Sequence, residues 1–194
     1  MINDVGINQS LQTLLEGNRR FAGSKQLHPN QDRERRNEVA KGQKPFAIIV
    51  GCSDSRIPPE ILFDQGIGDL FIIRLAGNIV DDTALGSIEY AVDHLGVRLV
   101  VVLGHSKCGA VTATVQGGEV HGHIGSIIQA ITPAIDRAKG KTGDLVDNTI
   151  RENTKLVAGY IASSQPILEQ MVNNGKIAVV SAHYDIDTGL VELI

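Results

Sequence analysis

Two cysteines and one histidine in this sequence have the residue types and spacing of metal ligands. Cys52 opens the segment Cys-Ser-Asp-Ser-Arg, and His105 and Cys108 lie in Gly-His-Ser-Lys-Cys-Gly. Cys52 and His105 each come two residues after a short apolar run, which ends at Val50 or Leu103 and is typical of a buried strand. Two thiolates and one imidazole suit zinc best among the common metals. Three protein ligands leave a fourth position open, as in a catalytic zinc site.

A simpler interpretation is that both cysteines are buried apolar side chains, a common role of free cysteine. An isolated His-x-x-Cys is a weak signal, but here it is combined with strand ends and with the flanking glycines Gly51, Gly104 and Gly109. This combination favours the metal site. His121 and His123 are expected to lie in a loop, although a fourth ligand from this pair stays an open alternative.

Asp54 and Arg56 lie two residues apart in the loop that starts at Cys52, so both can point into one crevice. An aspartate beside a metal-bound water can accept its proton or a hydrogen bond. An arginine beside that aspartate keeps it ionised and orients it through a planar fork. The alternative is an ordinary surface ion pair, which is less favoured so close to a predicted ligand. Asp54 could also occupy the fourth zinc position itself, which would displace the water and inactivate the site.

Four apolar runs predict the strands of a central sheet, at residues 45–51, 70–74, 97–103 and 176–181. Their continuous β-branched character indicates strands that are covered on both faces. A turn at residues 187–189 predicts one more strand, antiparallel and at the edge of the sheet. Strands that alternate with helices predict right-handed crossovers. The fold class is therefore α/β, with a mostly parallel central sheet of four strands, an antiparallel edge strand and flanking helices.

Helical periodicity predicts the segments between these strands, over residues 83–95, 108–116 and 144–174, the last with a break at Pro166. Sites in open parallel sheets lie beyond the carboxyl ends of the strands, so the predicted ligands meet at one edge. Cys108 is expected in the first turn of its helix, where the helix dipole favours a thiolate.

The first 41 residues predict a helical arm within a single domain that spans residues 1–194. Residues 8–22 have apolar side chains at helical spacing, with Ser10 as the expected N-cap, and residues 30–41 predict a second, polar helix. This arm has too little apolar surface to stand alone. We expect it to lie across another element, such as a second subunit.

Charge and composition argue against several classes of partner. The net charge of −4 does not favour nucleic acid or an anionic membrane surface as a partner. No apolar stretch approaches the ~20 residues of a membrane span. Two cysteines that both bind metal leave none for a disulfide, and the N-terminal segment lacks the pattern of a signal peptide. We therefore expect a cytoplasmic protein.

At these motifs the chain resembles the β-class carbonic anhydrases. The combination of Cys-x-Asp-x-Arg with a later His-x-x-Cys is highly specific. The resemblance implies a zinc enzyme that interconverts carbon dioxide and bicarbonate, by attack of zinc-bound hydroxide. It also implies an obligate homodimer, often paired into tetramers, with N-terminal helices that reach over the partner. The matching segments are Gly42–Pro45, Cys52–Arg56, Ile72–Asn78, Gly86–Ala91 and Gly104–Ala110.

The resemblance assigns roles residue by residue. It implies that Cys52, His105 and Cys108 are the zinc ligands and that Asp54 and Arg56 form the catalytic dyad.

The resemblance also implies a substrate pocket. Gln43 matches a glutamine that hydrogen-bonds substrate in the plant-type subgroup. Phe71 and Tyr90 match aromatic positions of that subgroup's apolar pocket, although in isolation both would be interpreted as core residues. Gly109 matches a position whose backbone N–H faces the substrate oxygen.

One position departs from the allosteric bacterial subgroup, which binds inhibitory bicarbonate with a tryptophan, an arginine and a tyrosine. Arg74 is present and Tyr184 is a candidate match, but Ile49 stands at the tryptophan position and the chain has no tryptophan. Together with Gln43, this difference favours the plant-type, non-allosteric subgroup, whose site is open near neutral pH.

Two other functions are compatible with the same residues. The same zinc could hydrolyse carbon disulfide or carbonyl sulfide, as some relatives of this fold do. The chain could instead be a zinc-storing or redox-sensing module, with a fully ligated zinc or with thiols that form a disulfide. Asp54, Arg56 and Gln43 would have no purpose in such a module.

Overall fold

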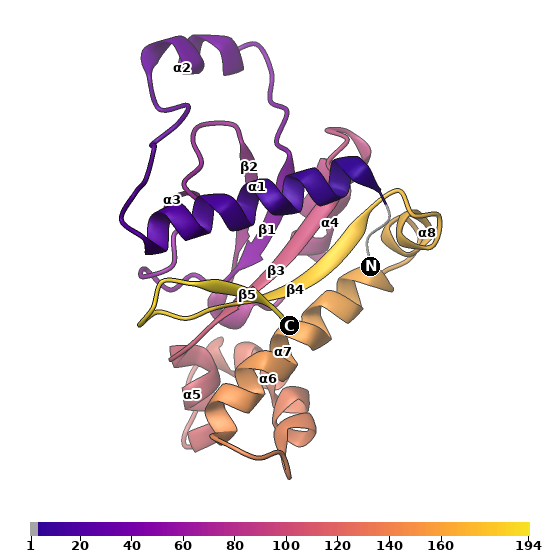
Figure 1. The fold of residues 1–194 in the computed structure, drawn as a ribbon. Helices are drawn as coiled ribbons and strands as arrows, with labels where there is room; N and C mark the ends of the chain where they lie inside the picture. Colours follow the sequence, from indigo (N-terminus) through magenta and orange to yellow (C-terminus); the bar gives the residue numbers. More distant parts are fainter. Residues whose placement is uncertain (1–3) are drawn as a thin grey trace.

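The structure is a computed structural model and describes residues 4–194. Five strands form one sheet in the order β2-β1-β3-β4-β5 (Figure 1). The first four strands are parallel, and β5 runs antiparallel to β4 at one edge. The predicted α/β fold is therefore confirmed. The strands are β1 Ala47–Gly51, β2 Leu70–Arg74, β3 Leu99–His105, β4 Ala178–Tyr184 and β5 Val191–Leu193.

Apolar side chains cover both faces of the sheet, because alternate residues of a strand point to opposite faces. On one face, Ile49 and Val101 belong to the buried cluster that includes residues of α1 (Val5–Ala22). On the other face, Ile48 belongs to a second cluster with residues of α4 (Asp82–Asp93). Burial on both sides explains why the strands read as continuous apolar runs.

Helices connect the strands largely where the sequence predicts them. The predicted helices at residues 83–95 and 108–116 correspond to α4 and to α5 (Gly109–Gln116), and the stretch 144–174 consists of two helices separated near Pro166. One long helix, α6 (Ile124–Ala138), is not predicted from the sequence. Among residues 4–194, no helix has both the length and the apolar character needed to cross a bilayer. The remaining helical elements are α2 Arg33–Val39, α3 Pro59–Leu62, η1 Ala76–Asn78, α7 Leu145–Ala162 and α8 Leu168–Asn173.

The third strand is longer than predicted, and this places a candidate ligand inside the sheet. The register between β3 and β4 continues through Gly104 with His183 and through His105 with Tyr184. The backbone N–H of Ser106 then donates to the Tyr184 carbonyl oxygen at 2.9 Å. The predicted end of this strand at residue 103 is therefore wrong by two residues. His105 is held by the ladder itself rather than by a loop.

The N-terminal arm divides into two parts. Helix α1 lies along this chain's own sheet, while α2 has no buried residue and stands away from the sheet (Figure 1). The predicted N-cap at Ser10 is wrong, because Ser10 lies inside α1. The N-cap is Asp4, whose Oδ1 accepts a hydrogen bond from the Ile7 N–H at 3.0 Å. Asn18 ties α1 to the β5 hairpin by donating to the Gly189 carbonyl at 2.9 Å.

A glycine allows α1 to approach the chain segment that follows α3, and a substitution tests this contact. A Cβ atom at Gly17 would lie 1.8 Å from the Phe63 carbonyl oxygen. Because backbone must move to make room, we expect Gly17→Ala to lower the free energy of unfolding by about 1–3 kcal/mol. Urea unfolding measures this difference.

The matched control for that substitution is Gly86→Ala. Gly86 is exposed in α4, and no atom lies within 4 Å of its Cβ position. Alanine should therefore stabilise this helix, by up to about 1 kcal/mol. Equal unfolding free energies for the Gly17→Ala variant and the wild-type protein would contradict the proposed close approach.

Candidate metal centre

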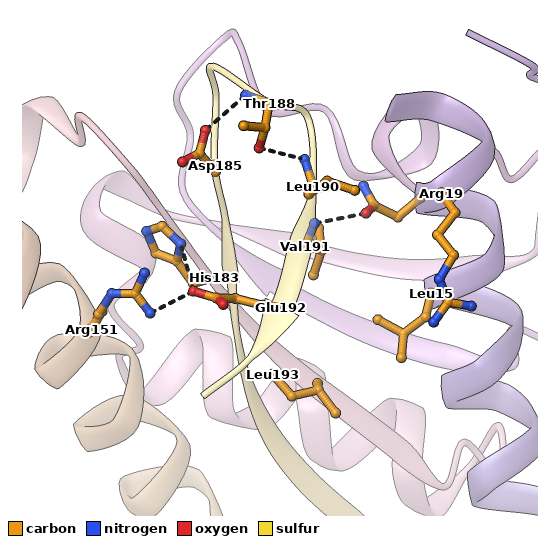
Figure 2. A pocket seen from close by; sticks show the side chains of 11 residues that line it. Leu15, Arg19, Arg151, His183, Asp185, Thr188, Leu190, Val191, Glu192 and Leu193 are labelled. Atoms are coloured by element: carbon orange, nitrogen blue, oxygen red, sulfur yellow. Dashed lines mark hydrogen bonds and ion pairs between the residues drawn. The ribbon is translucent and has the colours of Figure 1, made fainter. Parts of the chain in front are cut away.

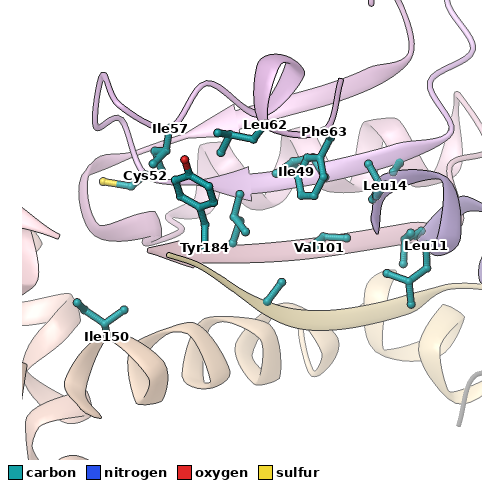
Figure 3. Packing of buried hydrophobic residues seen from close by; sticks show 14 of the residues in the cluster. Leu11, Leu14, Ile49, Cys52, Ile57, Leu62, Phe63, Val101, Ile150 and Tyr184 are labelled. Atoms are coloured by element: carbon teal, nitrogen blue, oxygen red, sulfur yellow. The ribbon is translucent and has the colours of Figure 1, made fainter. Parts of the chain in front are cut away.

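The three predicted ligands come together at the carboxyl ends of β1 and β3. Cys52 directly follows β1, His105 is the last residue of β3, and Cys108 is the N-cap of α5. All three side chains are buried, and their ligand atoms lie within 4.8 Å of one another. Cys52 lies at the border of the apolar cluster that also contains Ile57 and Tyr184 (Figure 3). The sheet therefore delivers all three ligands to one buried point.

The hydrogen bonding of His105 leaves one ring nitrogen available to a metal. Its Nδ1 lies 3.0 Å from the Ser106 carbonyl oxygen, so Nδ1 carries the proton and donates it. Its Nε2 is buried and has no hydrogen-bond partner within residues 4–194. Metal-ligating histidines commonly use one ring nitrogen in this way to orient the other. Because an unpaired buried acceptor costs free energy, this orphaned nitrogen fits a metal site.

The two thiols also fit a metal cation. The hydrogen bond from the Cys108 thiol lowers the pKa of Cys52 to about 4, against the opposing effect of burial. The same contact and burial raise the pKa of Cys108. The Cys108 thiol thus keeps its proton and donates it in a hydrogen bond to the Cys52 thiolate. A divalent cation that takes up both thiolates would release that remaining proton.

Asp54 and Arg56 form the bidentate ion pair that the sequence predicts. Arg56 donates from Nε to Asp54 Oδ1 at 2.9 Å and from Nη2 to Oδ2 at 2.7 Å. The hydrogen bond from the Arg56 side chain is the largest cause that lowers the pKa of Asp54 to about 2. Arg56 also donates from Nη2 to the Lys107 carbonyl at 3.0 Å, which joins the two ligand loops.

The fourth metal position is free of protein ligands in the described part of the chain. Among residues 4–194, the cluster of potential ligands at this point consists of Cys52, His105 and Cys108. The Asp54 carboxylate is instead held by Arg56. His121 and His123 are exposed, as the loop prediction requires. The arrangement has the open position of a catalytic site.

Arg74 has a role in the site that sequence reasoning missed. It pairs with Gly51 in the sheet, and its guanidinium donates to the Cys52 carbonyl at 2.8 Å and to the Asp54 carbonyl at 2.5 Å. These bonds fix the backbone of the loop that carries one ligand and the acidic residue. Tyr184, the other candidate for a regulatory pocket, is 4% exposed within the apolar cluster.

One of the four predicted substrate-binding residues, Gln43, is separated from the ligands by the length of β1. Gly109 directly follows Cys108 at the start of α5, and no atom lies within 4 Å of the position of its missing Cβ. Phe71 and Tyr90 contact each other, with ring centroids 6.4 Å apart. Gln43, however, is exposed before β1, at the opposite end of that strand from Cys52. Gln43 is therefore not brought to the ligands within this chain.

His183 lies apart from the metal cluster. It pairs with Gly104, so it points to the opposite face of the sheet from His105. It is one of the residues around a separate cavity of about 380 Å³, with Arg151 and Glu192 beside it (Figure 2). Burial lowers the pKa of His183. Its contacts place His183 against α7 rather than beside the metal ligands.

A sheet whose strand ends carry two sulfurs, an imidazole nitrogen and an Asp–Arg pair defines a catalytic metal site of the zinc type. Comparison with known proteins agrees with this class: the family model described as carbonic anhydrase matches residues 47–191. The chain belongs to the β-class carbonic anhydrases.

Individual relatives match over nearly the whole chain. A carbonic anhydrase of Mycolicibacterium smegmatis is 40% identical, over 94% of this chain and 90% of the relative. Carbonic anhydrase 2 of Mycobacterium tuberculosis is 37% identical, over 92% of this chain and 88% of the relative.

Solved structures show the same fold. The β-carbonic anhydrase of Coccomyxa, solved with acetazolamide, has a TM-score of 0.77 and 29% identity, and the match covers 95% of this chain and 86% of that one. A tetrameric β-carbonic anhydrase of Sordaria macrospora has a TM-score of 0.77 and 25% identity, with 96% and 97% covered.

Proposed function

We propose that this chain catalyses the reversible hydration of carbon dioxide to bicarbonate and a proton, with zinc held by Cys52, His105 and Cys108. The observation that carries this proposal is the buried cluster of three ligand atoms within 4.8 Å, beside the Asp54–Arg56 pair. Zinc bound there would act as a Lewis acid that makes water a nucleophile near neutral pH.

The Asp54–Arg56 pair orients the attacking water. A carboxylate with a pKa of about 2 is ionised at neutral pH and accepts hydrogen bonds, but it is too weak a base to hold the proton of water. Asp54 therefore acts by accepting a hydrogen bond that orients the water, and not by taking up its proton. Arg56 fixes the carboxylate through two parallel hydrogen bonds. Its third hydrogen bond, to the Lys107 carbonyl, holds the Arg56 side chain on the loop that carries Cys108.

The Asp54–Arg56 pair should also make the free energy of unfolding depend on pH in the acid range. The folded-state pKa of Asp54 is about 2, below its ordinary value of about 3.9. The stabilisation is therefore complete above about pH 4 and lost as the pH falls through about 2. At pH 6, we expect the free energy of unfolding in urea to be about 1–2 kcal/mol higher for the wild-type protein than for Asp54→Asn. The difference is no larger because partial exposure to solvent screens the ion pair.

The pH dependence of that difference is the informative measurement. The gap between the two proteins should narrow as the pH falls from 4 toward 2. A gap that stays constant over this range would mean that Asp54 is not held ionised by Arg56.

We propose a homodimer, able to pair into a tetramer, in which substrate residues act across the interface. Three features support this: Gln43 is separated from the ligands of its own chain, Tyr90 is 47% exposed, and β2 is an unpaired sheet edge. Helix α2 has no buried residue and is available to pack on a partner. The Sordaria macrospora relative is tetrameric. Light scattering during gel filtration measures the assembly, and a monomer that is fully active would contradict this arrangement.

We propose further that the site is of the non-allosteric type. Arg74 donates two hydrogen bonds to the ligand loop, and Ile49 is a fully buried apolar residue at the centre of β1. Steady-state rates should accordingly fall without steep cooperativity below neutral pH.

Parallel assays with carbon disulfide should detect no hydrolysis, which separates the proposed substrate from its sulfur analogues.

A further inference from the structure

A backbone N–H approaches the sulfur of Cys52 from the interior of the protein. The Gly77 N–H donates to Cys52 Sγ at 3.2 Å. Gly77 lies in η1 with φ of 69°, in the left-handed region that favours glycine. A Cβ there would also lie 2.7 Å from Ile131 Cδ1. The backbone conformation thus favours a glycine at this contact, and any larger residue would also displace the end of the Ile131 side chain.

One side chain from a distant helix holds this glycine in place. Asn153, in α7, is 1% exposed and donates from Nδ2 to the Gly77 carbonyl oxygen at 2.8 Å. The two residues are 76 positions apart in the sequence. Burying an amide is costly unless it is hydrogen-bonded, and here the bond is made to a residue whose own N–H contacts the ligand sulfur. The contacts form a chain from Asn153 through Gly77 to Cys52.

We propose that Asn153 is a positioning residue for the metal centre. Its hydrogen bond to the Gly77 carbonyl oxygen fixes the peptide group that follows Gly77, and so helps to hold this residue with its own N–H directed at the Cys52 sulfur. A hydrogen bond to a thiolate withdraws part of the charge that the sulfur gives to a metal. This would partly offset the strong donation of two thiolates and keep the metal a better Lewis acid. The inference rests on the metal site of the proposed function, but not on turnover.

The hydrogen bond between Gly77 and the sulfur can be observed directly. In ¹⁵N-labelled protein loaded with ¹¹³Cd, the Gly77 amide proton should show scalar coupling to the metal through Cys52 Sγ. In Asn153→Ala protein, which removes the anchor, this coupling should fall by at least half. Absence of the coupling in the wild-type protein, or an unchanged coupling in the variant, would overturn the proposal.

A second variant guards against a loss of folding in the first. Asn153→Asp keeps the shape of the side chain but places an oxygen against the Gly77 carbonyl. Competition with a chelator should show zinc affinity reduced by about 10-fold or more in both variants, the usual effect of losing a partner of a metal ligand. Affinity and coupling equal to wild type in Asn153→Asp would equally refute the role.

The matched control is Thr149→Val, in the same helix. Thr149 is fully buried, and its hydroxyl donates only to the Leu145 carbonyl one turn earlier, at 2.7 Å. This variant changes a buried polar group of α7 without touching Gly77, so coupling and zinc affinity should stay at wild-type values. A wild-type protein that shows the coupling but hydrates no carbon dioxide would contradict the proposed function alone.

Discussion

A Cys52→Ser variant is expected to purify with almost no zinc and to hydrate carbon dioxide at the background rate. Serine does not ionise near neutral pH, so the site would lose one of its two thiolates and keep only His105 and Cys108. Two ligands do not complete even the three-ligand set of a catalytic zinc. Elemental analysis and stopped-flow hydration measure the two losses.

The control for this variant is Ser55→Ala, an exposed position in the same loop. It should keep about one zinc per chain and wild-type turnover. Circular dichroism checks that both proteins are folded. Stoichiometric zinc in folded Cys52→Ser protein would show that Cys52 is not a ligand.

An Asp54→Asn variant is expected to separate metal binding from turnover. Its zinc content should stay at the wild-type level, because Asp54 lies outside the ligand cluster. Turnover should fall by about 100-fold or more, a size of effect that misplacement of reacting groups can produce. Asparagine offers one acceptor oxygen and turns an N–H₂ group toward Arg56, so the two parallel bonds from the guanidinium are lost.

Exposed Asp82 in the first turn of α4 supplies the comparison for this prediction. Asp82→Asn makes the same chemical change away from the site and should leave turnover unchanged. Wild-type rates in Asp54→Asn protein, measured at saturating substrate, would remove Asp54 from the mechanism. A loss of zinc would instead make it a ligand.

The clustering of the three candidate metal ligands could be predicted because their signal is local. Each motif follows an apolar run, and parallel strands bring their carboxyl ends to one edge. The strands themselves follow from the continuous burial of residues such as Ile49 and Val101 on one face and Ile48 on the other. Even the end of β3 was wrong by only two residues, since hydrogen bonding to β4 extends that strand to His105.

The supporting contacts could not be predicted, because they depend on tertiary pairing. Arg74 reads as a strand end, and only the register with Gly51 places it beside the ligand loop. Asn153 reads as a polar helix residue, and nothing near it in the sequence points to Gly77. These residues carry no local pattern that reveals their partners.

Two local features were missed for a different reason. Helix α6 contains Gly125 and Pro133, which lower helix propensity and hide its periodicity. The start of α1 was placed too late because Gly6, a poor helix former, follows the true N-cap, Asp4. In both segments packing against neighbouring elements outweighs the weak intrinsic preference of the chain.

Stopped-flow hydration of carbon dioxide, with zinc quantified in the same samples, is the decisive test of zinc-dependent hydration by this chain. We expect about one zinc per chain, rapid hydration, loss of activity when a chelator removes the metal, and recovery when zinc is restored. Fully metal-loaded, folded protein that does not accelerate hydration would contradict it, as would activity that survives complete removal of zinc.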